Sequence, residues 1–212
     1  MTDEPIADDL GRRRDRTYAY LKLWGIDTDL TVLPIIRAPR TIPSMAAVCG
    51  RATASSLVAL KGQGLSLPEV FAFADAYEVW GDLTVDEHDF VLDDSPSSEQ
   101  LVQFAWRFDQ AFVFEWALGL VAHLRFPDAS ADSGRVMEQL VTRVLTVEPA
   151  QRPIVRTAKE LADAADVAFA LQAIAIATAP EPPLLGIVRS VTIERAAAFE
   201  WLLSAPESAG AD

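Results

Sequence analysis

The segment FAWRFDQAFVFEWALGLV, residues 104–121, decides the fold class of this chain. Its apolar side chains recur at helical spacing, and its four Phe and two Trp are typical of a helix inside a core. Arg107 and Glu115 interrupt it, and an ionised group buried without a partner costs several kcal/mol. We therefore expect both charges to be neutralised by other helices, and to clamp this segment to the two helices predicted near the C-terminus.

Helix starts and stops continue on both sides of this segment. Ser66 with Glu69, and Thr157 with Glu160, have the spacing of capping boxes at helix N-termini. Alternating strand patterns are almost absent, and no repeat of fixed period occurs. The sequence therefore predicts an all-α fold.

The predicted architecture is a single compact domain of about seven helices over residues 16–204. Residues 97–125 are predicted to form its long central helix. A flexible charged N-terminus is expected over residues 1–15 and a polar C-terminal tail over residues 205–212. The arginines of residues 12–16 are interpreted as a solvated first turn or, alternatively, as a phosphate-contacting arm.

Composition narrows the functional classes. The chain has 212 residues, of which 50% are hydrophobic, and carries a formal net charge of -13. This charge argues against nucleic acid or an anionic membrane as a partner, because both are bound through Lys and Arg. The single cysteine, Cys49, allows no intrachain disulfide, and no apolar run reaches the ~20 residues of a membrane span. We expect a cytoplasmic protein.

The most acidic region is residues 82–99, with seven acidic residues and no Lys or Arg. The ligand order of an EF-hand is missing, so we interpret the region as a solvated loop. Its carboxylates are a candidate surface for a basic protein partner. These are Asp86, Glu87, Asp89, Asp93 and Asp94.

A second candidate site is a polar cluster in the apolar helices of the second half. Its members are Trp106, Arg107, Glu115, Arg156, Glu160, Asp163, Asp166, Glu194, Arg195 and Trp201. Closed salt bridges or a solvated face would explain the cluster without a ligand. Alternatively, an open cleft lined by Trp106, Arg107, Glu194, Arg195 and Trp201 would accept an anionic planar molecule.

Residues for catalysis are sparse. Only two histidines, His88 and His123, are available as bases, and Cys49 lies in an apolar helical context typical of a buried side chain. Zinc-ligand spacing and phosphate-binding loops are missing. We therefore predict no catalytic residues, no metal and no cofactor, and regard an enzyme as the less favoured class.

The order of motifs FAWRFDQ, EWALGLV, VRTAKELADAADVAFAL and TIERAAAFEWLL resembles the bacterial family called domain of unknown function 4272. The resemblance extends over roughly residues 12–203 and implies a cytoplasmic helical domain without an assigned activity. The matching positions are Trp106, Arg107, Trp116, Ala117, Leu118, Gly119, Arg156, Glu160, Leu161, Asp163, Asp166, Glu194, Arg195 and Trp201. The chain departs from the family pattern at Asp109, Ala170, Ala196 and Glu200, which argues against a catalytic role for this member.

Two functional hypotheses follow. The first is a non-enzymatic protein-interaction module with an acidic surface, of which an immunity- or antitoxin-like protein is one case. The second is a small-ligand-binding protein or hydrolase that uses the Arg, carboxylate and Trp cleft.

Overall fold

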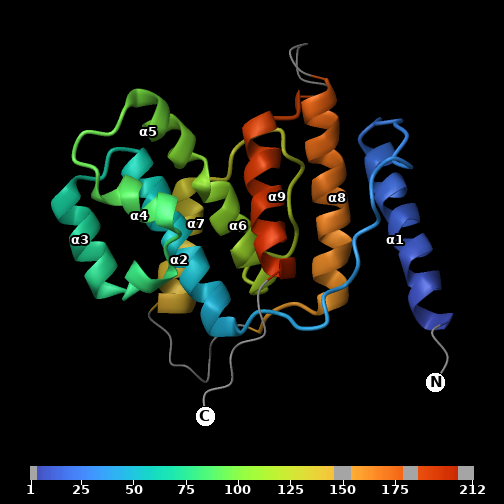
Figure 1. Ribbon diagram of the computed structural model, residues 1–212, viewed down its shortest axis with the longest axis horizontal. Helices are drawn as coiled ribbons and strands as arrows, with labels where there is room; N and C mark the ends of the chain where they lie inside the picture. Colours follow the sequence, from blue (N-terminus) through green and yellow to red (C-terminus); the bar gives the residue numbers. More distant parts are fainter. Residues whose placement is uncertain (1–3, 146–153, 179–185, 205–212) are drawn as a thin grey trace. The chain divides into compact units, whose positions relative to one another are not determined.

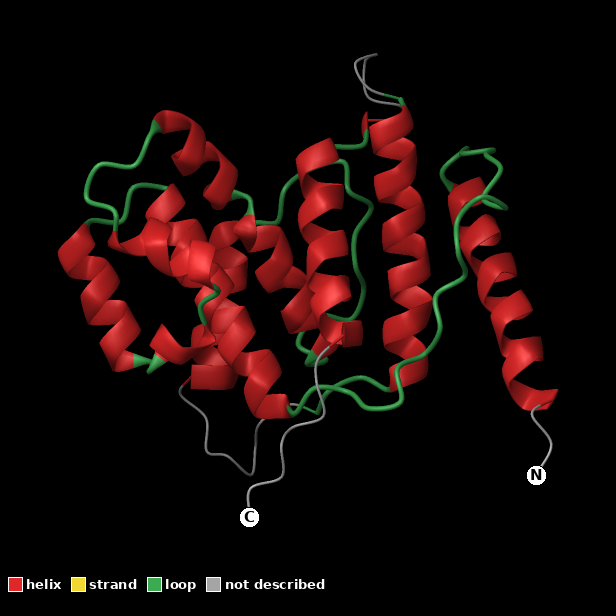
Figure 2. Cartoon of the chain, in the orientation of Figure 1, coloured by secondary structure: helices red, strands yellow, loops and turns green. Residues whose placement is uncertain are grey.

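The computed structural model describes residues 4–145, 154–178 and 186–204, and within these ranges the chain is helical and contains no strand (Figures 1 and 2). The all-α prediction is therefore confirmed for the described part of the chain. None of the helices in these ranges is long and apolar enough to cross a membrane. Contacts between Cα atoms divide the chain into two compact units, where a single domain over residues 16–204 was predicted.

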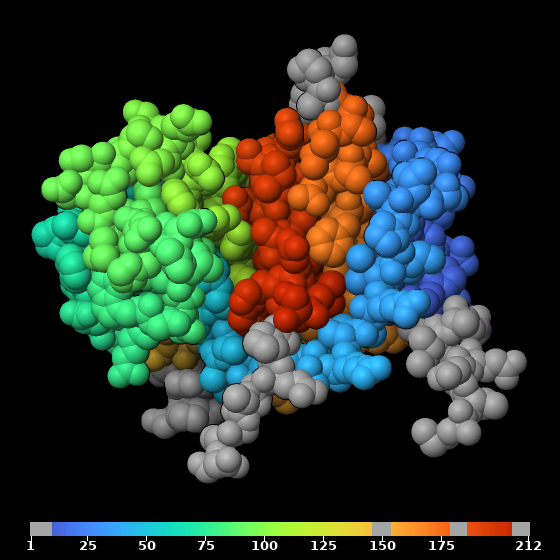
Figure 3. All heavy atoms as spheres, in the orientation of Figure 1, coloured from blue at the N-terminus to red at the C-terminus, as the bar shows by residue number. Residues whose placement is uncertain are grey.

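Unit 1 combines Met1–Ile42 with Thr157–Asp212. Its helices are α1 (Glu4–Leu23), α8 (Ala158–Ala177) and α9 (Arg189–Ser204), and α8 packs against both of the others (Figure 1). The segment that follows α1 runs along α8 (Figure 3). Residues 4–15 of the charged N-terminus belong to α1, and the predicted tail over 205–212 lies outside the described residues.

Unit 2, Pro43–Arg156, is built around α2 (Met45–Gly62). Helices α3 (Leu67–Ala76), α4 (Val85–Leu92), α5 (Ser98–Ala105), α6 (Arg107–Ala117) and α7 (Ser133–Leu140), with the 3-10 turn η1 (Val79–Asp82), all pack against it. Small and apolar residues cover nearly every face of α2, as expected for a helix enclosed on all sides. At Gly62 the approach to α5 is so close that a Cβ would lie 2.5 Å from the Ala105 nitrogen.

The predicted long central helix over residues 97–125 is wrong in two respects. It is interrupted at Trp106, where α5 ends and α6 begins, although no Pro or Gly marks the break. It also ends at Ala117, because Gly119 adopts a left-handed conformation with φ of 72°. The Leu120 and Gly119 amides donate to the Glu115 and Trp116 carbonyls at 3.0 and 2.9 Å, which is a Schellman motif.

The acidic region is also more ordered than predicted. Residues 85–92 form α4 instead of a solvated loop, and the helix begins with a capping box of Thr84 and Glu87. The capping boxes predicted from Ser66 and Thr157 are confirmed. After Leu140 the chain continues as one π-helical turn, Val141–Leu145, and the residues that follow it, 146–153, lie outside the described ranges.

Candidate functional site

Arg156, from the predicted polar cluster, closes the C-terminal end of α6. Its guanidinium donates to the carbonyls of Trp116, Val121 and Ala122 at 2.8, 3.1 and 3.3 Å. It also lies 4.7 Å from the centroid of the Trp116 ring. A cation is favoured at a helix C-terminus, where carbonyls have no helical partner. The Trp-Ala-Leu-Gly motif and Arg156 therefore form one helix cap.

Asp163 and Asp166 of the same cluster hold α1 on α8. Asp166 is buried and accepts hydrogen bonds from the Arg14 guanidinium at 3.1 Å, the Thr17 hydroxyl at 2.6 Å and the Ile36 amide at 3.2 Å. Asp163 is paired with Arg13 at 2.7 Å and with Arg16 and Lys159 at 2.8 Å each. The cations and hydrogen bonds outweigh burial and lower the pKa of Asp163.

This network corrects our interpretation of the N-terminal arginines. Arg13 is only 1% exposed and Arg14 also donates to the Leu30 carbonyl at 2.5 Å, so neither belongs to a solvated turn or a free arm. Glu160 has a local role, since its carboxylate accepts from the Thr157 amide at 3.0 Å within the capping box.

Arg107 lies in unit 2 beside Glu87, with its Nε 3.6 Å from the Glu87 carboxylate, and over the Phe104 ring. Arg51 of α2 reaches the same carboxylate through two hydrogen bonds of 2.8 and 3.0 Å. Burial alone would raise the pKa of Glu87, but the bonds and charge of Arg51 reverse the shift and lower it. Glu87 is thus a buried carboxylate paired with Arg51 and Arg107, and it is not part of an exposed acidic surface.

Glu115 behaves differently from the paired charge that we predicted. It is 1% exposed, and its Oε1 has no hydrogen-bond partner within the described residues. Burial raises the pKa of Glu115 to about 8, opposed only in part by the charge of Arg135. A carboxyl group with this pKa is mostly protonated at neutral pH, and burial then costs much less than it would for a carboxylate.

The remaining members of the predicted cluster are divided between the two units. Trp106 is half-buried at the start of α6, while Glu194 and Arg195 are buried on α9 and Trp201 is half-buried there. The cleft predicted from these residues and Arg107 would combine residues of both units.

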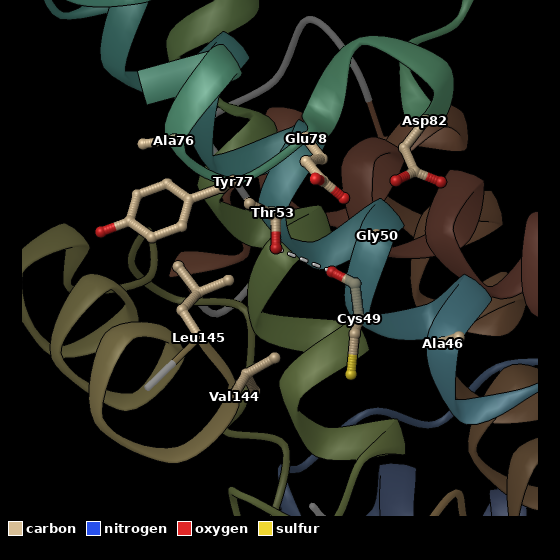
Figure 4. A pocket seen from close by; sticks show the side chains of 10 residues that line it. All are labelled: Ala46, Cys49, Gly50, Thr53, Ala76, Tyr77, Glu78, Asp82, Val144 and Leu145. Atoms are coloured by element: carbon tan, nitrogen blue, oxygen red, sulfur yellow. Dashed lines mark hydrogen bonds between the residues drawn. The ribbon is translucent and has the colours of Figure 1, made fainter. Parts of the chain in front are cut away.

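A pocket that the sequence did not predict lies within unit 2 over the first half of α2 (Figure 4). Its volume is about 360 Å³, near the lower end of the ~300–1,000 Å³ typical of small-molecule sites. The lining residues are Ala46, Cys49, Gly50, Thr53, Ala76, Tyr77, Glu78, Asp82, Val144 and Leu145. They come from α2, the end of α3, the turn η1 and the π-helical turn.

Two carboxyl groups enter this pocket from the segment after α3. Figure 4 shows the carboxyls of Glu78 and Asp82 over α2 near Gly50, and a Cβ at residue 50 would overlap the Asp82 carboxyl. Glu78 has a φ of 54°, unusual for a residue with a side chain. Burial raises the pKa of Asp82, although the charge of Arg51 opposes the shift.

Neither carboxyl group is neutralised by direct contact with a residue of the described ranges. Among the described residues, the side chains of Glu78 and Asp82 have no ion pair and no hydrogen bond. Arg51 donates to the backbone carbonyl of Asp82 at 2.5 Å and not to its carboxyl. Both terminal nitrogens of Arg51 also donate to the Glu87 carboxylate. The lining that the structure describes therefore carries negative charge and no basic side chain.

An exposed acidic face accompanies the pocket in unit 2. We define this acidic face as Asp86 and Asp89 of α4 with Asp93 and Asp94 after it; all are exposed except the half-buried Asp93. Residues 62–106 contain ten acidic residues and no Lys or Arg, so no basic neighbour in sequence offsets them. Among the described residues, no group of three or more His, Cys, Asp or Glu is placed to hold a metal ion.

Sequence reasoning missed the pocket because its residues are far apart in the chain and belong to no motif. Cys49 was predicted to be a buried side chain in a helix, and Asp82 to lie in a solvated loop. The single usable signal was the absence of Lys and Arg over residues 62–106, which leaves any carboxyl of that segment without a local cation.

The described part of the chain defines an all-α protein whose charged residues mostly cap helices or form ion pairs. The chain belongs to the family DUF4272, a domain of unknown function, whose model matches residues 13–209. This confirms the resemblance seen over residues 12–203. Neither the curated proteins nor the solved structures contain a match to the chain.

Proposed function

We propose that this protein is a non-enzymatic interaction module that binds a basic protein partner through the acidic face of unit 2. The exposure of Asp86, Asp89 and Asp94 carries the proposal, because these carboxylates remain open to solvent while Glu87 on the same helix is buried and paired. Negative charge gathered on one face speeds the encounter with a basic partner and orients it.

The roles of the predicted polar cluster also favour a binding protein over an enzyme. Arg156 caps α6, Glu160 caps α8, and Asp163 and Asp166 anchor α1. These groups already have partners in the fold, so they are poorly available for acid or base chemistry. Neutralisation of a basic toxin is one activity that an acidic binding module could have.

The test compares two variants with the same change in net charge. Asp86→Lys, Asp89→Lys and Asp94→Lys together reverse the acidic face, whereas Asp128→Lys, Glu138→Lys and Glu200→Lys reverse three exposed acids elsewhere. A partner purified with the wild-type protein from its native host is titrated with both variants at low and at physiological salt. We expect the first variant to lose at least tenfold in affinity, mainly through slower association, and the second to lose much less.

Equal affinities for the wild type and the reversed acidic face at low salt would refute the proposal. An equal loss in both variants would also refute it, because binding would then depend on net charge and not on this face.

A further inference from the structure

We infer that the pocket over Gly50 is a binding site for an organic monocation, an alkylammonium or alkylguanidinium group. The inference goes beyond the proposed function, because the pocket and the acidic face share no residue and each can bind without the other. The pocket has two carboxyl groups, from Glu78 and Asp82, on one side and the apolar residues Val144 and Leu145 on the other.

The charge of the pocket selects a cation. Glu78 and Asp82 present two carboxyls to the same space, and none of the described residues that line it is Lys, Arg or His. Arg51 contacts the backbone of Asp82, but two hydrogen bonds to Glu87 fix its guanidinium. Arg51 therefore cannot turn to bind the Asp82 carboxyl without breaking a buried ion pair.

The shape of the pocket selects an organic cation with an apolar stem. Val144 and Leu145 lie opposite the two carboxyls and form the apolar side of the pocket (Figure 4). The Tyr77 ring lies beside Leu145. A stem of a few methylene groups would pack on this apolar side, and an aromatic face attracts a cation within about 6 Å of the ring centroid. The volume of about 360 Å³ is sufficient for such a group.

The absence of a side chain at Gly50 leaves room for the Asp82 carboxyl. The Asp82 carboxyl occupies the space that a side chain at position 50 would take, so any larger residue would displace it. Thr53 contributes a hydroxyl to the same lining, and it donates to the Cys49 carbonyl at 2.9 Å, which fixes its position.

Keeping Asp82 ionised in this position is unfavourable for folding. Its partly buried carboxyl has a raised pKa and no hydrogen bond among the described residues, so a neutral amide should be tolerated equally well. A charge that does not stabilise the fold is typical of a binding residue, because sites for ligands often conflict with stability.

The test uses propylguanidinium chloride as the probe and propylurea as its uncharged analogue of nearly the same shape. Binding is followed through the backbone amide resonances of Gly50 and Thr53 in the full-length protein. We expect a saturable shift with propylguanidinium and none with propylurea. Asp82→Asn and Glu78→Gln should each weaken the affinity for propylguanidinium at least tenfold, while Asp86→Asn on the exposed side of α4 should leave it unchanged.

Two results would overturn the inference. One is a response to propylurea as large as that to propylguanidinium, since the charge would then be irrelevant. The other is the absence of saturable binding, or equal affinity in Asp82→Asn, in a protein whose amide spectrum shows that it is folded. Since Glu78 is exposed, Glu78→Gln remains informative even if the Asp82 variant were to unfold.

A second titration identifies the source of the cation. The peptide acetyl-Gly-Arg-Gly-amide presents the same guanidinium on a chain. If it shifts the same amides with similar affinity, the pocket can accept an arginine side chain of a protein partner. If only the free cation binds, the ligand is a small molecule. Binding of either one supports a cation site, and loss of both refutes it, whatever the acidic face binds.

Discussion

The two units use their charged residues in different ways. In unit 1, the carboxylates of Asp163 and Asp166 are surrounded by Arg13, Arg14 and Arg16 and hold α1 on α8. In unit 2, one carboxylate, Glu87, is neutralised by arginine, but Glu115 and Asp82 are buried or partly buried without such a contact in the described residues.

The difference indicates which carboxyl groups are available to bind a ligand. A carboxylate with two or three donors stabilises the structure and has little capacity left for a ligand. A carboxyl with a raised pKa and no partner contributes unfavourably to folding when ionised, so it depends on protonation or on a bound cation. By this criterion Asp163 and Asp166 of unit 1 are structural residues, whereas Asp82 and Glu115 of unit 2 are candidates for a role in binding.

The largest effect is expected from Asp166→Ala in unit 1. The substitution leaves the buried Thr17 and the largely buried Arg14 without their shared acceptor, and removal of one partner of a buried pair costs about 3–5 kcal/mol. Urea unfolding measures the loss, and Asp15→Ala, an exposed acid on α1, is the control with an expected change below ~0.5 kcal/mol. Equal stability of the two variants would show that the ion network does not hold α1.

The next effect is the pH dependence from Glu115 in unit 2. Because its pKa is raised to about 8 in the folded state, the folded protein binds more protons than the unfolded protein between the ordinary Glu pKa and pH 8. The free energy of unfolding contributed by Glu115 is therefore largest at low pH and falls by up to ~1.4 kcal/mol per pH unit as the pH rises through this range.

Glu115→Gln should remove this dependence and leave the protein more stable than wild type near pH 8. Denaturant unfolding at several pH values between 5 and 8.5 measures it. A wild-type stability with the same pH profile as Glu115→Gln would contradict the buried, protonated carboxyl.

A smaller effect is expected from Arg156→Lys. Lysine keeps the charge but cannot donate to the Trp116, Val121 and Ala122 carbonyls at once or stack as a plane on the Trp116 ring. The expected loss is about 2 kcal/mol in thermal or urea unfolding, against almost none for Arg143→Lys at an exposed position. If both variants unfold alike, the cap is held by charge alone.

The smallest effect is expected from Gly119→Ala at the end of α6. A residue with a Cβ at a φ of 72° costs roughly 1–2 kcal/mol relative to Gly. Gly81→Ala is the control, because φ is not positive there and an added Cβ would contact nothing within 4 Å. The same melting temperature for both variants would argue against the Schellman motif.

Local signals predicted much of the fold. The capping boxes at Ser66 and Thr157 depend on neighbouring residues, so the sequence alone revealed the starts of α3 and α8. The break at Trp106 was not predictable, because no Pro or Gly marks it. The hydrogen bond from the Ser130 hydroxyl to Asp109, at 2.9 Å, was not predictable either, because it joins residues 21 apart. The central position of α2 was missed as well, since its small residues have no strong amphipathic pattern.

The candidate sites were less predictable than the helices. Charge composition indicated the acidic face, and α4 presents Asp86 and Asp89 as exposed residues. The charge pattern gave no reason to distinguish Glu87 from these exposed acids, although Glu87 belongs to the capping box and contacts Arg51. The pocket depends on Gly50 and Asp82 meeting across 32 positions of the chain, and a single sequence does not contain that pairing.

The most direct test of the contrast between the two units is a pH titration of the side-chain carboxyl carbons by NMR. We predict that Glu115 titrates with a pKa near 8 and Asp82 above its ordinary value, while Asp163 and Glu87 titrate below theirs. Ordinary pKa values for Glu115 and Asp82 would contradict the account, because neither of these carboxyl groups of unit 2 would then depend on a proton or a bound cation.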